Sequence, residues 1–209
     1  MTAPASAIVV AGGASRRLGQ DKRQLRLGSP RTLLEATVAT VSALADDVVV
    51  VVSTDPTTFA GLTARVVQDP EPGAGPLNAL VAGLAAIEHD VALVVACDLP
   101  FLSPALLGRL LDEPRDYDLL VPVRSDGRLE MLHAMYRTSC LEPARRRLAE
   151  RRLKLAGLAD DVRARFVDES WLRRDDPSLR SFLNLNTPED LRRVTELLAQ
   201  ARGHARRES

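Results

Sequence analysis

The sequence contains few cysteines and no long apolar run. Cys97 and Cys140 are the only cysteines among 209 residues, and their wide separation fits neither a disulfide framework nor a zinc knuckle. No segment approaches the roughly 20 consecutive apolar residues that a membrane-spanning helix requires. Residues 1–6 also lack the charged start and apolar centre of a secretory signal peptide. We therefore expect a cytoplasmic protein with no membrane contact.

A net charge is also lacking, because 28 lysine and arginine residues balance 28 aspartate and glutamate residues. A neutral chain has no overall field that favours nucleic acid or an anionic membrane surface, so we expect no nucleic-acid partner. Any anionic ligand must then be bound by local groups. Lysine is scarce, since Lys22 and Lys154 are the only two. The one that lies in a glycine-rich segment, Lys22, is therefore a candidate ligand-binding residue.

Short runs rich in valine, leucine and alanine alternate with segments of helical periodicity. Residues 48–52 are apolar without alternation, which is typical of a strand buried on both faces of a parallel sheet. Apolar stripes predict helices, and Ser103-Pro104 and Thr187-Pro188 are typical helix starts. We expect helices around residues 34–44, 77–85 and 191–201, and strands at residues 5–10, 47–52, 65–68, 91–96, 117–123 and, after a turn at 124–129, an antiparallel strand at 131–136.

The alternation of strands and helices predicts the α/β fold class. The length, with 45% hydrophobic and 27% charged residues, fits one domain with ample material for a core. No linker rich in proline, glycine or serine divides the chain. We expect a single domain over residues 1–201 and a disordered basic tail over residues 202–209.

A glycine-rich segment, AGGASRRLGQDK at residues 11–22, follows the first expected strand directly. The carboxyl edge of an α/β sheet is where such folds bind ligands. Adjacent glycines let backbone N–H groups approach an anion, and Arg16, Arg17 and Lys22 supply positive charge. The spacing is that of neither a P-loop nor G-x-G-x-x-G. We predict a phosphate-binding loop of another kind; the alternative is a glycine turn with solvated arginines.

Two aspartates follow expected strands and should emerge at the same edge. Asp98 comes after the strand at 91–96, where a Mg²⁺ ligand would lie, and Mg²⁺ needs only one or two carboxylates besides phosphates and water. Asp69 comes after the strand at 65–68. Either aspartate can instead close the turn before the proline that follows it. Beyond Asp69, Asn78 near the start of a helix offers a donor and an acceptor that can read the edge of a base.

The glycine-rich segment resembles the signature L-A-G-G-x-S-x-R-M-G-x-D-K of the MobA-like nucleotidyltransferases, the molybdenum cofactor guanylyltransferases. Leu18 replaces the usual methionine and Val10 a frequent leucine. Three further motifs follow in the family's order, DPEPGAGPL at 69–77, CDLPFL at 97–102 and NLNTPEDL at 184–191. The resemblance implies a three-layer αβα Rossmann-like nucleotidyltransferase fold with a mostly parallel mixed sheet.

The resemblance also implies a reaction, the Mg²⁺-dependent transfer of GMP from GTP to the phosphate of molybdopterin with release of pyrophosphate. Proteins of molybdenum insertion or molybdoenzyme maturation are the partners that it suggests. It assigns the metal to Asp98 and catalysis to Arg17, Lys22 and Asp98. The nucleotide-binding residues that it implies are Val10, Ala11, Gly12, Gly13, Lys22, Ser53, Asp69, Gly75, Pro76, Leu77 and Asp98. Asn184 and Asn186 either contact the acceptor or serve as cap and turn residues.

Some features stand outside these motifs. Ala79 replaces a common glycine of the family, and Met131 replaces a proline. His133 has no nearby partner of a metal site or triad, so we expect it to be structural or to face the acceptor. Ten arginines lie between residues 145 and 180 and form either a solvated helix face or a grip on an anionic acceptor.

Three alternatives accompany this interpretation. A cytidylyltransferase, or another nucleotidyltransferase of this fold acting on molybdopterin or a phosphorylated small molecule, shares most motifs but often has A-A-G at residues 11–13. A nucleotide-binding adaptor without activity would explain Ala79 and Met131, although the intact Lys22 and Asp98 argue against a decayed site. An NAD-linked Rossmann enzyme is disfavoured by the missing G-x-G-x-x-G.

Overall fold

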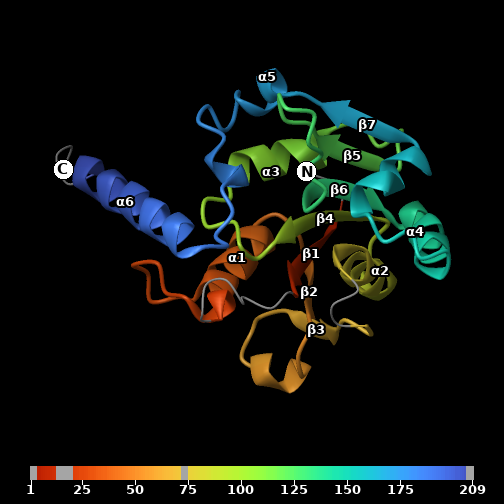
Figure 1. Ribbon diagram of the computed structural model, residues 1–209, viewed down its shortest axis with the longest axis horizontal. Helices are drawn as coiled ribbons and strands as arrows, with labels where there is room; N and C mark the ends of the chain where they lie inside the picture. Colours follow the sequence, from red (N-terminus) through yellow and green to blue (C-terminus); the bar gives the residue numbers. More distant parts are fainter. Residues whose placement is uncertain (1–3, 13–20, 72–74, 206–209) are drawn as a thin grey trace.

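The sheet at the centre of the protein is mixed (Figure 1). The computed structural model describes residues 4–12, 21–71 and 75–205, with the backbone alone for residues 201–205. Within these residues, seven strands pair in the order β3-β2-β1-β4-β6-β5-β7, and all neighbours are parallel except β6, which is antiparallel to β4 and β5. The strands are β1 (Ser6–Ala11), β2 (Asp47–Val52), β3 (Arg65–Gln68), β4 (Val91–Ala96), β5 (Leu119–Pro122), β6 (His133–Arg137) and β7 (Ala164–Val167).

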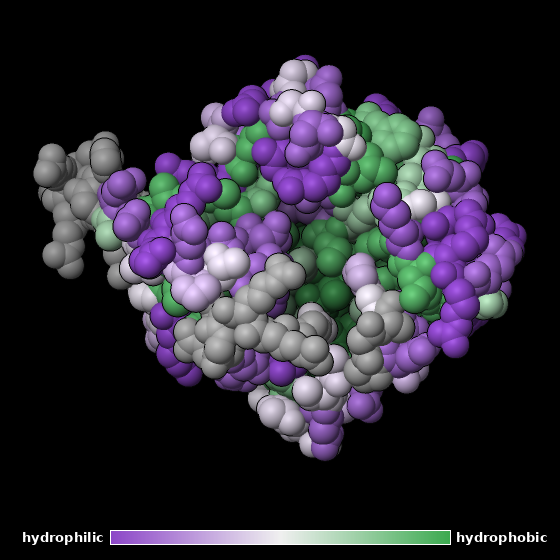
Figure 2. Space-filling view, viewed as in Figure 1, coloured by the Kyte–Doolittle hydropathy of each residue, from purple (hydrophilic) through white to green (hydrophobic). Residues whose placement is uncertain are grey.

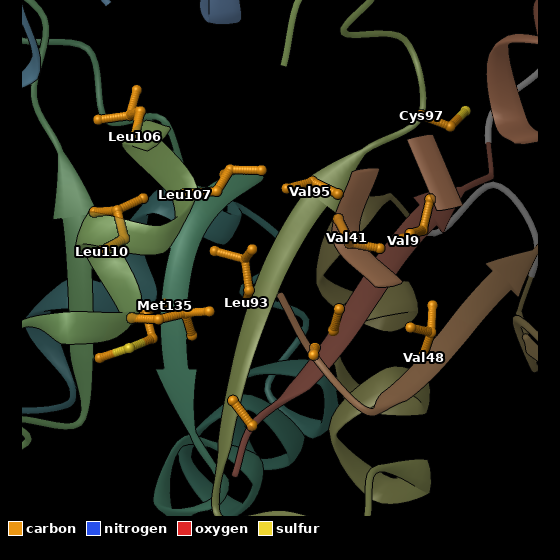
Figure 3. Packing of buried hydrophobic residues seen from close by; sticks show 14 of the residues in the cluster. Val9, Val41, Val48, Leu93, Val95, Cys97, Leu106, Leu107, Leu110 and Met135 are labelled. Carbon is orange, nitrogen blue, oxygen red and sulfur yellow. The ribbon is translucent and has the colours of Figure 1, made fainter. Parts of the chain in front are cut away.

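Helices cover both faces of the sheet, which confirms the expected three-layer αβα architecture. One apolar cluster packs α1 and α3 on one face, and a second packs α2 and α4 on the other. Successive strand residues enter opposite clusters, as Ile8 and Val9 do, because side chains alternate along a strand. Figure 3 shows the first cluster, where Val9 and Leu93 of the sheet lie near Val41 and Leu107. The helices are α1 (Leu33–Ser42), α2 (Pro76–Ala86), α3 (Pro104–Asp112), α4 (Leu141–Ala149), α5 (Glu169–Leu172) and α6 (Pro188–Ala205).

Most of the predicted elements are confirmed. At both predicted helix starts a hydroxyl accepts a backbone hydrogen bond, Ser103 from Leu106 and Thr187 from Asp190. The strand β7 was not expected, because its sequence ARFV is short and largely exposed at the edge of the sheet. The last helix, α6, continues to Ala205, past the boundary expected at residue 201, and residues 206–209 lie outside the described part of the chain. None of the described helices has the length and apolarity needed to cross a membrane.

The strand register brings several segments to one edge of the sheet. β1 and β4 end level with each other, because Val10 pairs with Ala96. The segment after β3 stays beside the end of β2, where Asp69 N donates to Val52 O over 2.8 Å. The antiparallel β6 begins at this same edge, since His133 pairs with the penultimate residue of β4. Residues that follow β1, β2, β3 and β4 therefore meet residues that precede β6.

His133 of β6 is a core residue. Its side chain is buried, and its ring centroid lies 4.5 Å from that of Phe182. Neither ring nitrogen has a hydrogen-bond partner among the described residues. Burial lowers the pKa of His133 to about 4, against a weaker opposite effect of Asp176, because the imidazolium is poorly solvated there. This environment supports the structural role rather than the acceptor-facing one.

Replacing His133 with leucine is expected to remove an acid sensitivity of the fold. The pKa is 6.5 in the unfolded reference and about 4 in the folded protein. The unfolded state therefore takes up the proton first, and the free energy of unfolding falls as the pH drops from about 6.5 to about 4, by roughly 3 kcal/mol in full. Urea titrations at pH 7.5 and 4.5 should show a smaller loss for His133→Leu than for the wild type. An equal loss in His133→Leu and in the wild type would contradict the prediction.

Candidate active site

A cavity of about 550 Å³ opens at the edge of the sheet where these segments meet. Figure 2 shows apolar side chains in a hollow near the middle of this face. One side of the cavity, here called the β1-side wall, consists of Val10, Gly12, Ser53, Asp69, Gly75, Pro76 and Ala79. The other side, the β6-side wall, consists of Leu129, Glu130, Met131, Leu132, Leu155 and Ala156. Asp98 follows β4, the strand between β1 and β6, and so it lies between the two walls.

Lys22, Asp98 and Asn186 form a polar group at the centre of this site. Lys22 belongs to a short 3-10 helix, Lys22–Gln24, and its Nζ donates to Asp98 Oδ2 over 2.6 Å and to Asn186 Oδ1 over 3.1 Å. The backbone fixes the same arrangement, because Leu185 N donates to Asp98 O over 2.9 Å. The side chains of Lys22 and Asp98 are only 12% and 13% exposed. A poorly hydrated ion pair therefore joins two segments that are distant in sequence, and the hydrogen bond from Lys22 to Asn186 joins a third.

One carboxylate oxygen of Asp98 has no partner in the part of the chain that the structure describes. Its Oδ1 is buried and has no hydrogen-bond partner among the described residues, although Oδ2 is bound by Lys22. A buried carboxylate oxygen without a partner is costly, and such atoms usually mark a position that a ligand or ion completes. Within the described residues no group of three or more histidine, cysteine or acidic side chains could hold a metal ion. The donor set fits a hard cation that takes one carboxylate from the protein and its other oxygens from substrate and water.

Asp69 stabilises the turn that follows β3 and also lines the cavity. Its Oδ1 accepts a hydrogen bond from Glu71 N over 3.0 Å and another from Asn78 Nδ2. Asn78 Nδ2 also donates to Glu71 O over 3.3 Å. The amide donors of Asn78 are thus engaged within the protein, and its side chain is buried. The expectation that Asn78 reads a base edge is therefore wrong for these two amide donors.

The N-terminus of α2 faces the cavity. Gly75 precedes the helix with a φ of 94°, a conformation that side chains other than glycine rarely adopt. Pro76 takes the first helical position, and the N-cap residue Gly75 has no side chain with which to cap the helix start. The first turn of a helix carries unpaired N–H groups and a partial positive charge. Gly75, Pro76 and Ala79 line the cavity at this point, so the helix end is available to an electronegative group.

The structure brings most of the expected site residues together and separates a few. Val10, Gly12 and Ser53 line the cavity, and Asn184 lines it beside Asp98. Ala11 and Leu77 are buried in the two core clusters and support the site from beneath without lining it. Gly13 and Arg17, expected in binding and catalysis, lie outside the described residues.

The expected arginine cluster is in part structural. Arg147 is buried and donates to Gly157 O over 2.8 Å and to Asp161 Oδ2 over 2.7 Å. These protein oxygens take the place of the water that would hydrate the guanidinium of a surface arginine. The contacts hold the segment after α4 in place. This arginine therefore stabilises the β6 side of the fold and has no free charge for an acceptor.

Sequence reasoning missed most of the β6-side wall. Residues 129–132 precede β6 and were expected only as a turn and a strand, while Leu155 and Ala156 begin a 3-10 helix, Leu155–Asp160, that has no sequence signal. Cys97 also lines the cavity, but burial raises the pKa of its thiol to about 12, so it stays neutral. The carboxyl of Glu130 has a pKa raised by burial, against the opposite effect of Arg128 and Arg124.

Comparison with known proteins agrees with the motifs. The family described as MobA-like NTP transferase domain matches residues 7–163. A probable molybdenum cofactor guanylyltransferase of Chloroflexus aggregans is 44% identical over 202 residues, which cover 92% of this chain and 94% of that protein. A molybdenum cofactor guanylyltransferase of Desulfosudis oleivorans is 34% identical, with 93% and 96% covered.

The likeness extends to a solved structure. The molybdopterin-guanine dinucleotide biosynthesis protein A of Archaeoglobus fulgidus superposes with a TM-score of 0.81 at 26% identity, covering 93% of this chain and 99% of that one. Its fold is the three-layer mixed-sheet architecture expected from the sequence. The match over residues 7–163 and the identities over nine-tenths of the chain support one conclusion, that the chain belongs to the family of MobA-like NTP transferase domains.

Proposed function

We propose that this protein transfers GMP from GTP to the phosphate of molybdopterin, with Mg²⁺ as cofactor. The observation that carries the proposal is Asp98 Oδ1, which is buried without a hydrogen-bond partner among the described residues and lies beside Lys22 at the junction of the two walls. The names of the relatives from Chloroflexus and Desulfosudis support the guanylyl group and the acceptor. We also infer a cytoplasmic setting, with proteins of molybdenum insertion or molybdoenzyme maturation as partners, from the resemblance in sequence.

The reaction joins two phosphates and demands little acid–base chemistry. An oxygen of the acceptor phosphate forms a bond to the α-phosphorus of GTP, the bond from that phosphorus to the β-phosphate oxygen breaks, and pyrophosphate leaves. The attacking oxygen is already anionic, so the protein contributes mainly by positioning and by neutralising charge. Lys22 is suited to stabilise the leaving pyrophosphate, and the N-terminus of α2 is suited to electronegative atoms of the nucleotide.

Asp98 is the residue that would hold the metal, through Oδ1. When bound, Mg²⁺ supplies positive charge that lowers the repulsion between the two phosphates. Asn186 orients Lys22 through its Oδ1, and the backbone bond from Leu185 keeps Asp98 in place. These contacts hold the charged groups before substrate arrives, which lowers the reorganisation required during the reaction.

The proposed function predicts how nucleotides affect stability. GTP with Mg²⁺ should raise the melting temperature of the wild type, since a ligand at a hundredfold excess over its Kd stabilises by roughly 2.7 kcal/mol. Asp98→Ala should lose the Mg²⁺-dependent part of this rise, whereas Asp112→Ala, an exposed change at the end of α3, should keep it. Thermal-shift curves with GTP, CTP, ATP and NAD measure this. A rise with CTP alone would favour a cytidylyltransferase, and no rise with any nucleotide would contradict the proposal.

The second prediction concerns turnover. Lys22→Met and Asp98→Ala should each lower the rate of pyrophosphate release with molybdopterin as acceptor by 10²–10³-fold, or about 3 kcal/mol, because each removes one preorganised charge. The chain offers a matched control, since Lys154→Met makes the same change at the only other lysine, which is exposed. Lys154→Met should retain the wild-type rate. Turnover near that of the wild type in both site variants would contradict the assignment of Lys22 and Asp98 to the reaction.

A further inference from the structure

The two walls of the cavity differ in chemistry. The β1-side wall offers the helix N-terminus, Gly12, Ser53 and Asp69 to a ligand. The β6-side wall is apolar except at one residue, since its lining consists of Leu129, Met131, Leu132, Leu155, Ala156 and Glu130. A polyphosphate has no favourable contact with such a surface, whereas a flat heteroaromatic ring does. The β6-side wall therefore suits the part of a substrate that carries no charge.

Glu130 is the only charged side chain that the described part of the β6-side wall presents. Its side chain is 15% exposed, and the contacts to described residues are made by Oε1. Oε1 accepts from Arg128 Nε over 3.2 Å, with Arg128 Nη2 at 3.0 Å and Arg124 Nη1 at 3.7 Å. Oε2 makes no hydrogen bond to any described residue. A carboxylate in this state has acceptor capacity left for a ligand.

The backbone around Glu130 is fixed. Glu130 N donates to Pro122 O over 2.9 Å, and His133 N donates to Glu130 O over 3.0 Å. Arg124, which lies near Glu130 Oε1, is itself held by Glu169 Oε1 at 2.9 Å. The carboxylate thus stands in a preorganised position, and its partial burial strengthens any hydrogen bond that it accepts.

We propose that Glu130 and the apolar β6-side wall bind the ring of the acceptor, with the Glu130 carboxylate accepting hydrogen bonds from the amino group and ring N–H of a 2-amino-4-oxopyrimidine edge. The inference rests on the proposed function, which gives the β1-side wall to the nucleotide. Glu130 Oε2 can only accept hydrogen bonds and Lys22 can only donate them, so the acceptor phosphate turns toward Lys22 and the N–H groups of the ring turn toward Glu130. Glu130 is then a specificity-determining residue for the acceptor.

Guanine carries the same 2-amino-4-oxopyrimidine edge as a pterin, so the test must separate the two sources. The probes are 6-hydroxymethylpterin and 6-hydroxymethyllumazine, which has a carbonyl in place of the 2-amino group. Calorimetric titration should show that the wild type binds the pterin more tightly than the lumazine. Glu130→Gln should weaken pterin binding about 10- to 100-fold, as expected when a charged hydrogen-bond acceptor is lost. Lumazine and Mg²⁺·GTP should bind as they do to the wild type.

A matched control removes a carboxylate that pairs with an arginine outside the cavity. Glu142→Gln breaks the exposed contact of Glu142 with Arg145 on α4 and leaves Glu130, Arg124 and Arg128 unchanged, so its pterin affinity should equal that of the wild type. In the full reaction, Glu130→Gln should raise the KM for molybdopterin and leave the KM for GTP unchanged, whereas Glu130→Asp should recover part of the loss. A purely structural role would affect both substrates.

The outcomes separate this inference from the proposed function. If Mg²⁺·GTP does not bind the wild type, the proposed function fails. If GTP binds but the wild type does not prefer the pterin to the lumazine, or if Glu130→Gln keeps that preference, the role of Glu130 is overturned. Loss of GTP affinity in place of pterin affinity would assign the carboxylate to guanine and also overturn it. Should Glu130→Gln fail to fold, the wild-type preference and the Glu130→Asp variant still decide the result.

Discussion

The ion pair between Lys22 and Asp98 is the contact on which the site depends. It joins the segment after β1 to the end of β4, and Asn186 adds the segment before α6. Breaking one partner of a poorly hydrated pair leaves a charge without compensation, which costs more than the pair contributes in water. The Leu185–Asp98 backbone bond and the packing of the strands hold the geometry independently. Binding chemistry and local stability are therefore coupled at these three residues.

The sheet makes this contact possible. Parallel strands β1, β2, β3 and β4 end at one edge, so the short segments that follow them are neighbours despite their separation in sequence. α2 packs closely on β1, since a Cβ on Gly83 would lie 2.6 Å from Ile8 Cγ2. This close approach sets where the N-terminus of α2 stands relative to the cavity. Packing within the core thus fixes the position of polar groups that themselves contribute little to it.

Much of this arrangement follows from sequence, and the rest depends on tertiary structure. The positions of Asp98 and Asp69 at strand ends were predictable because apolar runs mark where the strands end, and parallel strands share a carboxyl edge. The burial of Ala11 and Leu77 was not, since a position beside a motif does not say which way its side chain faces. Nor could the β6-side wall be predicted, because it combines a turn with a 3-10 helix from a different part of the chain.

Because β6 runs antiparallel to β4, the two walls of the cavity are built from different kinds of chain segment. On one side, residues line the cavity directly after parallel strands. Substitutions are restricted there, because the backbone conformation of Gly75 favours glycine and the strand ends fix the neighbouring positions. On the other, residues 129–132 reach it as the chain enters an antiparallel strand from a turn. Under the proposed assignment of the walls, substitutions in that turn alter the surface for the acceptor without displacing the groups for the nucleotide. A single antiparallel strand then separates the part of the fold that serves the nucleotide from the part in which a second substrate can vary.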